Sequence, residues 1–246
     1  MAVTFVDSAA AVIAMVNNVT GLPTSPPSLY FDLEGQELSR TGTISIFQLL
    51  VHPQDQVYLI DIHVLGDTAF VTAGTDGNTL RGVLESPSIP KACFDVRNDS
   101  DALYHHFGIS LQGIHDIQLM ENASRGHQSS RRLLNGLIKC IEADTYLTMQ
   151  EKQAWRIVKD QGVKLFAPEK GGSYEVFNSR PLHDDIKAYC VQDVRLLTTL
   201  WDTYWHRLDQ DWKTRVEFET RARVQESQSP HYRPHGEHKA LGPWPR

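Results

Sequence analysis

The stretch LYFDLEGQ, residues 29–36, places two carboxylates within a sequence that is otherwise typical of a buried β-strand. Alternate residues of a strand project from the same face, so Asp32 and Glu34 point to one side while Phe31 and Leu33 point to the other. Two like charges are thereby held close together. A D-x-E triplet is weak evidence alone, because chance supplies about one in an acid-rich chain of this length. A solvent-facing acidic strand edge remains the alternative.

The sequence around this stretch predicts a mixed α/β chain. Two further strand-like runs, residues 42–51 and 56–62, follow between Gly, Pro and Asp turns, and together with 28–34 they predict an antiparallel meander. Strands are then predicted at 89–96 and 113–120. A helix at 101–108, ended by Gly108, is predicted between them.

Helical periodicity dominates both ends of the chain. Asp7 or Ser8 is expected to cap a first helix that runs to about Val16. The C-terminal part has helical spacing of apolar residues in three segments, 129–143, 148–162 and 181–208. The sequence from about Ser227 is rich in Pro, His and Gly, and we expect it to be poorly ordered.

Composition is that of an ordinary globular protein, with 246 residues of which 41% are hydrophobic and 22% charged. Its three cysteines include no CxxC pair, which argues against a disulfide framework or a structural zinc site. The apolar N-terminal run carries Asp7, lacks a basic leader and is too short to span a bilayer. We therefore expect an intracellular protein of the cytoplasm or nucleus that is not secreted and has no membrane partner.

A third carboxylate lies on the apolar stripe of the last predicted helix. Asp193 shares that stripe with apolar residues at helical spacing, and Tyr189 precedes it by one turn on the same face. Burying an unpaired carboxylate costs several kcal/mol, so such a residue usually has a cation, a metal ion or strong hydrogen bonds. The alternative is a core tyrosine beside a salt-bridged aspartate.

A fourth acidic candidate lies in KACFDVRNDSDALYHHFGI, residues 91–109, where Asp95, Asp99 and Asp101 compete. Asp99 shares a helix face with Leu103, whereas Asp101 points roughly the opposite way, so Asp99 is the better inward-facing candidate. Its alternative role is an N-cap for the following helix, although Ser100 could fill that position.

These residues, in this order, resemble the DEDD superfamily of 3′–5′ exonucleases, in the branch with a tyrosine in its third motif. That branch includes RNase D, the exosome-associated exonuclease and the proofreading domains of DNA polymerases. FDLEG resembles the first motif, the 91–109 stretch resembles the second and selects Asp99, and YCVQD supplies the Tyr-x-x-x-Asp of the third. The resemblance covers roughly residues 29–204. In overall character the chain resembles the small exonuclease-domain proteins of the Exuperantia and Exd1 groups, some of which have lost catalytic acids and act as RNA-binding scaffolds.

The resemblance implies an RNase H-like (DnaQ-like exonuclease) fold, a mixed central β-sheet flanked by α-helices with a helical C-terminal extension. Residues 1–28 would form an N-terminal helix and Pro-rich connector, 29–210 the exonuclease domain, and 211–246 a basic helical or irregular tail. The second motif departs from the family pattern because Phe94 and Asp95 replace a histidine that often follows its strand.

The resemblance also implies a metal-dependent 3′–5′ exonuclease that uses two divalent ions, Mg²⁺ or Mn²⁺. Asp32 would bridge both ions, Glu34 and Asp193 would complete the site of the attacking water, and Asp99 would hold the second ion. Tyr189 would orient the water, because a phenol with a pKa near 10 is a poor general base at neutral pH. The alternative is a catalytically silent RNA-binding scaffold on the same fold.

The expected partner is single-stranded nucleic acid, with RNA favoured over DNA by the resemblance. The formal net charge of −6 includes the four carboxylates of the proposed metal site, so local patches matter more than the total. Basic side chains on or near the 129–143 helix are candidates for phosphate contacts, with solvated helix faces as the alternative. They are Arg125, Arg131, Arg132 and Lys139. The sequence leaves the oligomeric state open.

Overall fold

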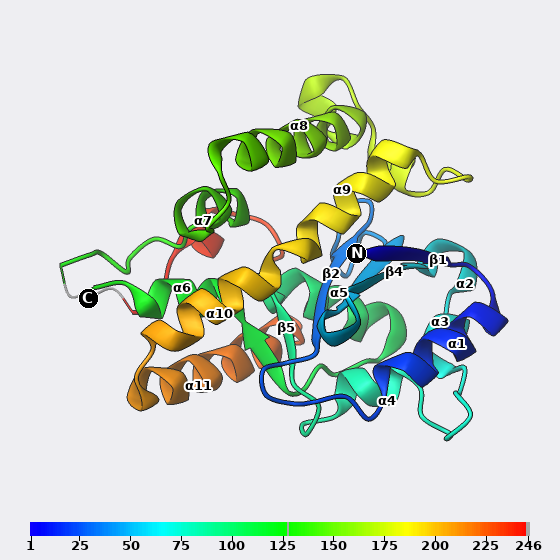
Figure 1. Cartoon of the computed structure of the whole chain (residues 1–246), viewed down its shortest axis with the longest axis horizontal. Helices are drawn as coiled ribbons and strands as arrows, with labels where there is room; N and C mark the ends of the chain where they lie inside the picture. The colour runs from blue at the N-terminus through cyan, green and yellow to red at the C-terminus, as the bar shows by residue number, and fades with distance from the viewer. Residues whose placement is uncertain (127, 245–246) are drawn as a thin grey trace.

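A computed structural model describes residues 1–126 and 128–244, with a six-stranded mixed β-sheet at its centre (Figure 1). The strand order is β1-β4-β3-β2-β5-β6. The strands are β1 (Ala2–Val6), β2 (Leu29–Glu34), β3 (Ile46–Val51), β4 (Gln56–Asp61), β5 (Lys91–Cys93) and β6 (Ile114–Asp116). Strands β2, β3 and β4 form the predicted antiparallel meander, and β5 and β6 continue the sheet parallel to β2.

Alternation along β2 divides the interior into two hydrophobic cores, one on each face of the sheet. Phe31 and Leu33 belong to the core that also contains helices α1 (Ala9–Val19), α4 (Leu80–Glu85) and α5 (Val96–Phe107). Tyr30 belongs to the opposite core, with α9 (Asp184–Arg195) and α10 (Leu197–Arg207). Because Asp32 and Glu34 have the parity of Tyr30, they project toward α9.

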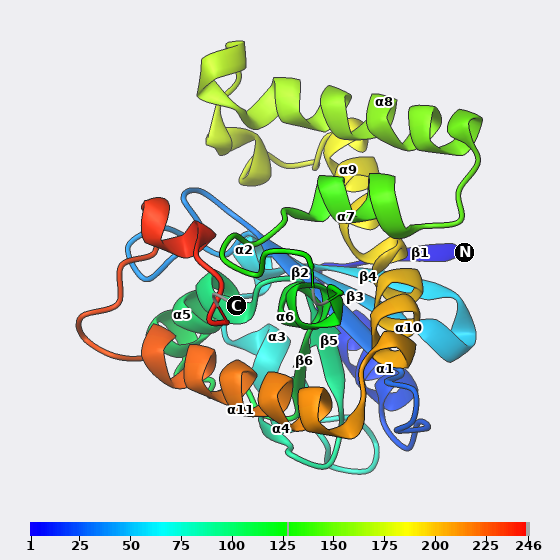
Figure 2. The same ribbon diagram turned by 90° about the vertical axis from the view of Figure 1, so that its left-hand side faces the viewer.

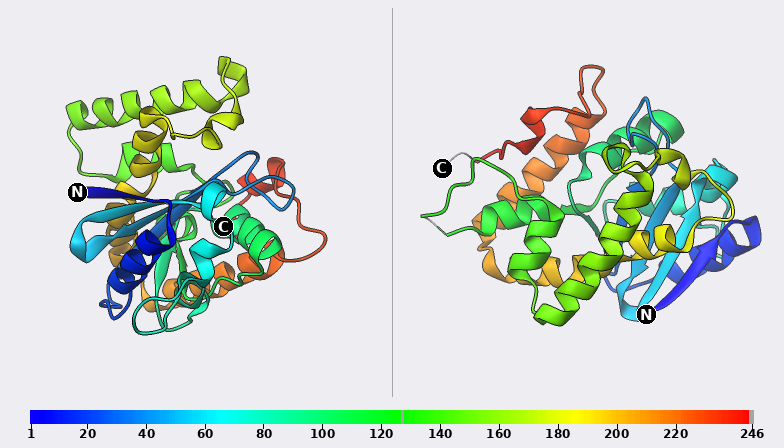
Figure 3. Two further views of the ribbon diagram at one scale, coloured as in Figure 1. Left: turned by 90° about the vertical axis from the view of Figure 1, so that its right-hand side faces the viewer. Right: turned by 90° about the horizontal axis from the view of Figure 1, so that it is seen from above.

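The remaining helices complete the two outer layers. They are α2 (Ile62–Leu65), α3 (Thr68–Val71), α6 (Ile117–Ser124), α7 (Leu137–Asp144), α8 (Met149–Phe166) and α11 (Gln210–Ser227). Helix α11 packs against α5, α6 and β6. Helix α8 packs on α9, and Figure 2 and the left view of Figure 3 show it outside α9, away from the sheet.

Several predicted elements have different bounds in the structure. Residues 2–6, expected to belong to a helical N-terminus, form strand β1, which pairs in parallel with β4. The helix capped by Ser8 is confirmed and extends to Val19. The predicted strand 113–120 is a short strand followed by α6, and the predicted helix 129–143 is helical only from Leu137.

The predicted end of the helix in the second motif is confirmed. Gly108 follows Phe107 in a left-handed conformation, φ 64°, which glycine adopts without steric cost. The helix begins earlier than expected, at Val96, with Asp95 as its N-cap residue. The single helix predicted at 181–208 is interrupted at Leu196, the cap residue shared by α9 and α10.

Residues 228–244, which we call the C-terminal strap, are packed onto the body, contrary to the expectation of poor order. Leu241 forms a β-bridge with Leu133. The Tyr232 hydroxyl and the Lys239 ammonium donate hydrogen bonds of 2.8 and 2.6 Å to Oδ1 of Asn98, one residue before Asp99. Figure 2 shows the strap passing beside α5. The expectation was wrong because these polar side chains have partners on the body.

The three cysteines, Cys93, Cys140 and Cys190, are buried and form no disulfide within the described chain. This agrees with the expectation from their spacing. Among the described helices, none has the length and apolar character needed to cross a membrane.

Candidate active site

Three of the predicted acidic residues converge at the face of the sheet covered by α9. Asp32 and Glu34 project from β2, and Asp193 faces them from α9. Each offers a carboxylate oxygen, and these oxygens all lie within 4.8 Å of one another. Asp193 is only 4% exposed, so the apolar stripe of the helix does carry its carboxylate into the interior.

Asp99 approaches the same cluster from the first turn of α5. Its side chain is 4% exposed, and burial, followed by the charge of Asp32, raises the pKa of its carboxyl well above the usual range. It lies outside the group of three whose oxygens are within 4.8 Å. The N-cap alternative does not apply, because Asp95 occupies that position.

Tyr189 lies one turn before Asp193 and is 8% exposed. Its ring packs edge-on against Phe166 of α8, with centroids 5.1 Å apart. Burial, and then the nearby Asp193 carboxylate, raise the pKa of the phenol well above its ordinary value. The residue therefore stays protonated at neutral pH and can position a water molecule by hydrogen bonding, but it is unsuited to act as a base.

Burial and mutual repulsion disfavour ionisation of the acidic cluster. Burial, and then repulsion by Asp193, raise the pKa of Asp32 to about 8. The pKa of Glu34 is raised well above its usual range, first by burial and then by Asp32, with the Tyr189 hydroxyl acting in the opposite direction. Carboxylates crowded in this way require cations to remain charged.

The donor set fits divalent metal ions. Within the described residues, Oδ2 of Asp99 and Oδ2 of Asp193 are buried and have no hydrogen-bond partner. Such atoms are costly to bury unless something outside the protein satisfies them. All four side chains offer hard carboxylate oxygens, the ligands that Mg²⁺ and Mn²⁺ prefer.

Sequence reasoning missed a lysine that contacts this cluster. Lys159 of α8 is 6% exposed, and its ammonium is ion-paired and hydrogen-bonded to Oδ1 of Asp193. The same ammonium lies 3.5 Å from the ring centroid of Tyr189. Trp155, Lys159 and Gly162 are the buried positions of α8, spaced four and three residues apart. That helical spacing could have revealed Lys159 as inward-facing.

Gln48 is a second polar residue that sequence reasoning missed. It is the β3 partner of Asp32 in the antiparallel register and is fully buried. Neither side-chain polar atom has a hydrogen-bond partner among the described residues. Gln48 interrupts the apolar run ISIFQLLV, and this interruption was the signal available in the sequence.

A groove of about 450 Å³ begins two residues beyond Glu34. The loop 36–43 forms one wall and residues 172–175 the other. Tyr174 in the second wall stacks on Phe166, which in turn contacts Tyr189. The groove therefore lies beside the segment that follows Glu34, and its described lining contains none of the four predicted acids.

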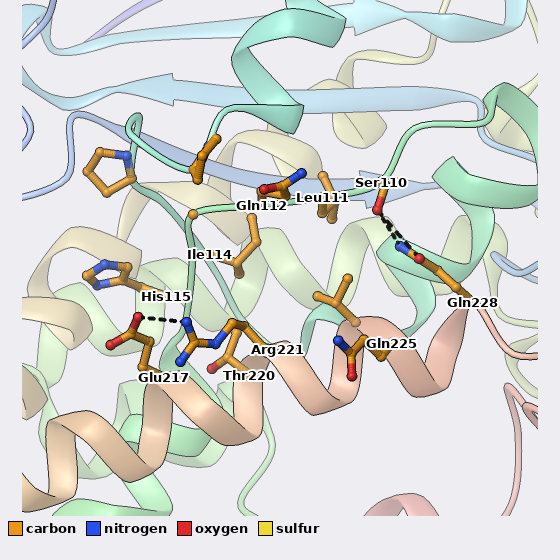
Figure 4. Close-up of a pocket in the computed structure, with 14 residues that line it drawn as sticks. Ser110, Leu111, Gln112, Ile114, His115, Glu217, Thr220, Arg221, Gln225 and Gln228 are labelled. Carbon is orange, nitrogen blue, oxygen red and sulfur yellow. Dashed lines mark hydrogen bonds and ion pairs between the residues drawn. The ribbon is translucent and has the colours of Figure 1, made fainter.

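A cavity of about 480 Å³ lies elsewhere, between α11 and residues 110–115 (Figure 4). It adjoins the N-terminal ends of β5 and β6, whereas Asp32 and Glu34 lie toward the C-terminal end of β2. Its described lining contains none of the predicted catalytic residues. The cavity consequently has no part in the candidate active site.

The four predicted basic residues are not equivalent in the structure. Arg125 is paired with Glu121 and donates to the carbonyls of Ser130 and Leu133. Arg131 is 5% exposed and donates to backbone carbonyls of the same region, so it is unavailable to a phosphate in this conformation. Arg132 and Lys139 are exposed, and a nucleic-acid contact at these two stays a prediction.

Comparison with protein families gives a match over most of the chain. The sequence profile of a family described as 3′–5′ exonuclease matches residues 2–209. Among curated proteins, the mouse piRNA biogenesis protein EXD1 is 31% identical over 143 residues. The match covers 55% of this chain and 24% of the mouse protein, so it spans about a quarter of that relative's length.

Solved structures show the same fold at low sequence identity. Trypanosoma brucei RNase D in complex with RNA U12 is 21% identical, has a TM-score of 0.71, and aligns over 92% of this chain and 70% of its own. Brucella melitensis NrnC with bound Mg²⁺ is 18% identical, has a TM-score of 0.59, and aligns over 93% of this chain and 92% of its own. The mixed sheet flanked by helices is therefore the RNase H-like exonuclease fold expected from the sequence.

Proposed function

This chain belongs to the 3′–5′ exonuclease family, and from that membership we propose that it hydrolyses single-stranded nucleic acid from the 3′ end to 5′-mononucleotides. The observation that carries the proposal is the convergence of Asp32, Glu34 and Asp193, whose carboxylate oxygens lie within 4.8 Å of one another. Asp99, with a buried oxygen that lacks a partner among the described residues, supports it.

The four carboxylates would hold two divalent ions, with Asp32 serving both. Glu34 and Asp193 would complete one site, and Asp99 the other. Such ions, when bound, supply Lewis-acid charge that activates water and stabilises the leaving 3′-oxygen. The carboxylates would hold the positive charge of the ions at the C-terminal end of β2.

Tyr189 and the groove would perform the positioning. The protonated phenol, adjacent to Glu34 and Asp193, can hold an attacking water by a hydrogen bond. The groove formed by the loop that follows Glu34 would bind the nucleic acid near its 3′ end, and Tyr174 in its wall would offer an aromatic face for a base. RNA is the favoured substrate because the T. brucei RNase D structure contains RNA and the EXD1 relatives are named for piRNA biogenesis.

The proposal is tested with 5′-labelled single strands in Mg²⁺ or Mn²⁺, beside chelated samples. We expect single-nucleotide laddering from the 3′ end, and protection of circular and 3′-phosphorylated strands. Asp32→Asn and Asp193→Asn should each abolish turnover. Asp184→Asn, an exposed carboxylate on the same helix as Asp193, is the matched control and should retain it. Efficient cutting of circles would identify an endonuclease instead.

Matched RNA and DNA strands decide the substrate, and binding assays address the alternative of a silent scaffold. A protein that binds RNA tightly but leaves its 3′ end intact in both Mg²⁺ and Mn²⁺ would be a scaffold on the exonuclease fold. Faster shortening of the RNA strand than of the DNA strand would support the exoribonuclease.

A further inference from the structure

The ammonium of Lys159 occupies a position that a cation at the acidic cluster would be expected to hold. It is hydrogen-bonded to Oδ1 of Asp193, and its charge also acts on Asp32 and Glu34, where it opposes the rise in pKa that burial and repulsion cause. The positive charge of Lys159 therefore acts on the same three carboxylates that offer ligands to a metal ion, and contacts one of them, Asp193.

Close packing of helix α8 on α9 positions the Lys159 side chain. Gly162, one turn beyond Lys159, packs so closely on Tyr189 that an added Cβ would lie 2.6 Å from the Tyr189 ring. The absence of a side chain at Gly162 lets α8 approach α9 closely. The ammonium of Lys159 then lies over the Tyr189 ring, where a cation–π contact adds to its ion pair.

Burial strengthens the electrostatic interaction of the Lys159 ammonium with its surroundings. Lys159 is 6% and Asp193 4% exposed, so solvent screens their interaction poorly. A divalent ion at the same carboxylates would meet a fixed positive charge a few ångströms away. The ammonium and the divalent ion therefore compete for the Asp193 carboxylate.

We infer that Lys159 is a resident counter-ion that competes with a divalent metal ion for the Asp32, Glu34 and Asp193 carboxylates. The inference rests on the proposed metal-dependent function and adds a control on metal loading. In the metal-free protein the ammonium neutralises part of the acidic cluster. A divalent ion bound through the unpartnered Oδ2 of Asp193 would repel the ammonium on Oδ1, so we expect metal loading to displace the ammonium and thereby to involve α8.

The test measures Mn²⁺ affinity by calorimetry and by electron paramagnetic resonance, without nucleic acid. Lys159→Gln retains a hydrogen-bond donor but removes the charge, and we expect it to bind Mn²⁺ about tenfold more tightly than wild type, a typical coupling between two ligands. Lys159→Arg, which keeps the charge, should stay near wild type. Lys164→Gln removes an exposed lysine from the same helix and should leave the affinity unchanged.

A measurement on the unaltered protein covers the case in which the glutamine variant does not fold. With lysine labelled at Cε, titration with diamagnetic Mg²⁺ should move one shielded resonance to the position of exposed lysines. A spectrum unchanged at saturating Mg²⁺ would overturn the inference.

The outcomes separate the inference from the proposed function. If wild type binds Mn²⁺ and shortens RNA, but Lys159→Gln binds no more tightly, the counter-ion role is wrong and the nuclease proposal stands. If wild type neither binds Mn²⁺ nor cuts, while Lys159→Gln binds it, the counter-ion role is supported and the wild-type activity is not. If neither protein binds Mn²⁺, both are wrong.

Discussion

Asp32 is a single residue whose ionisation should affect the stability of the metal-free protein. Its folded pKa of about 8 exceeds the ordinary value of about 4, so between these pH values the folded chain retains a proton that the unfolded chain has released. The free energy of unfolding should therefore fall as pH rises from about 4 to 8. Thermal unfolding in chelator at pH 5 and pH 8 measures this.

Asp32→Asn isolates the effect of that carboxyl from other titrating groups. The variant should lose less stability between pH 5 and 8 than wild type, whereas Asp184→Asn should keep the wild-type slope. Saturating Mn²⁺ should reduce the wild-type slope, since a bound cation favours the charged form. An equal slope in Asp32→Asn and wild type would contradict the assignment.

Tyr189 provides a second prediction at the residue scale. Tyr189→Phe keeps the ring against Phe166 and removes only the hydroxyl. We expect the single-turnover rate to fall about a hundredfold, as for the loss of a positioning contact, with little change in RNA affinity. Comparable losses in rate and affinity would instead indicate that the hydroxyl has a structural role.

The sequence located the acids better than it located the groups around them. The apolar pattern made Asp32, Glu34 and Asp193 only weak candidates, and their selection came from the resemblance of the three motifs, in their order, to those of the exonuclease family. Lys159 has a long apolar stem that suits a half-polar helix, and the exposed charges around it obscured the helical spacing that it shares with Trp155 and Gly162. The internal pairing of Arg131 was also unpredictable, since its carbonyl partners, Ala123 and Arg125, lie at the C-terminal end of α6 and are reached only through tertiary packing.

Contact between helices α8 and α9 leads to a prediction at the scale of elements. Gly162→Ala places a methyl group 2.6 Å from the Tyr189 ring and should force the helices apart, at a cost of about 1–3 kcal/mol. The exposed Gly82 of α4 is the control, because Gly82→Ala meets only Thr79 Oγ1 at 3.4 Å and should be neutral or stabilising. Denaturant unfolding of both variants gives the comparison. Equal stabilisation by the two substitutions would show that α8 can move away from α9 without a cost in stability.

Elements with local signals were predicted well, and those formed by distant contacts were not. The β2–β4 meander has alternating apolar residues and short turns, and the helix of the second motif has its terminal Gly108. Strand β1 was missed because it pairs with β4, more than fifty residues away, and adjoins a helix without a turn signal. The interruption at Leu196 was missed because the helical spacing of apolar residues continues through the boundary between α9 and α10.

At the scale of the whole molecule, the C-terminal strap connects the chain's end to two parts of the exonuclease domain. The Arg40 guanidinium, in the loop after β2, donates to the carbonyls of Ser229 and Pro230, and Tyr232 and Lys239 donate to Asn98. A chain ending at Gln228 loses these bonds and should lose about 2–4 kcal/mol of stability, at roughly 1 kcal/mol per bond.

A chain ending at Trp244 is the matched control, because it keeps every strap contact described above. Calorimetric unfolding of the two truncated chains and wild type should separate them clearly. If the chain ending at Gln228 unfolds at the wild-type temperature, the strap contributes nothing to the fold. Loss of the strap should also reduce the proposed nuclease activity. The charge of Lys239 acts to lower the pKa of Asp99 and so favours the ionised carboxylate that would hold a metal ion.

The reactivity of the three buried thiols can report transient opening of the regions around them. Cys93 ends β5 and Cys190 adjoins Tyr189, whereas Cys140 lies on the separate helix α7, and burial raises the pKa of all three. A thiol reagent can modify each only while its surroundings are open, so the labelling rate measures the free energy of that opening. Added Mn²⁺ should slow modification of Cys93 and Cys190 more than that of Cys140. The order in which the three thiols are protected, measured by mass spectrometry, would show how far the stabilising effect of the bound ion extends through the protein.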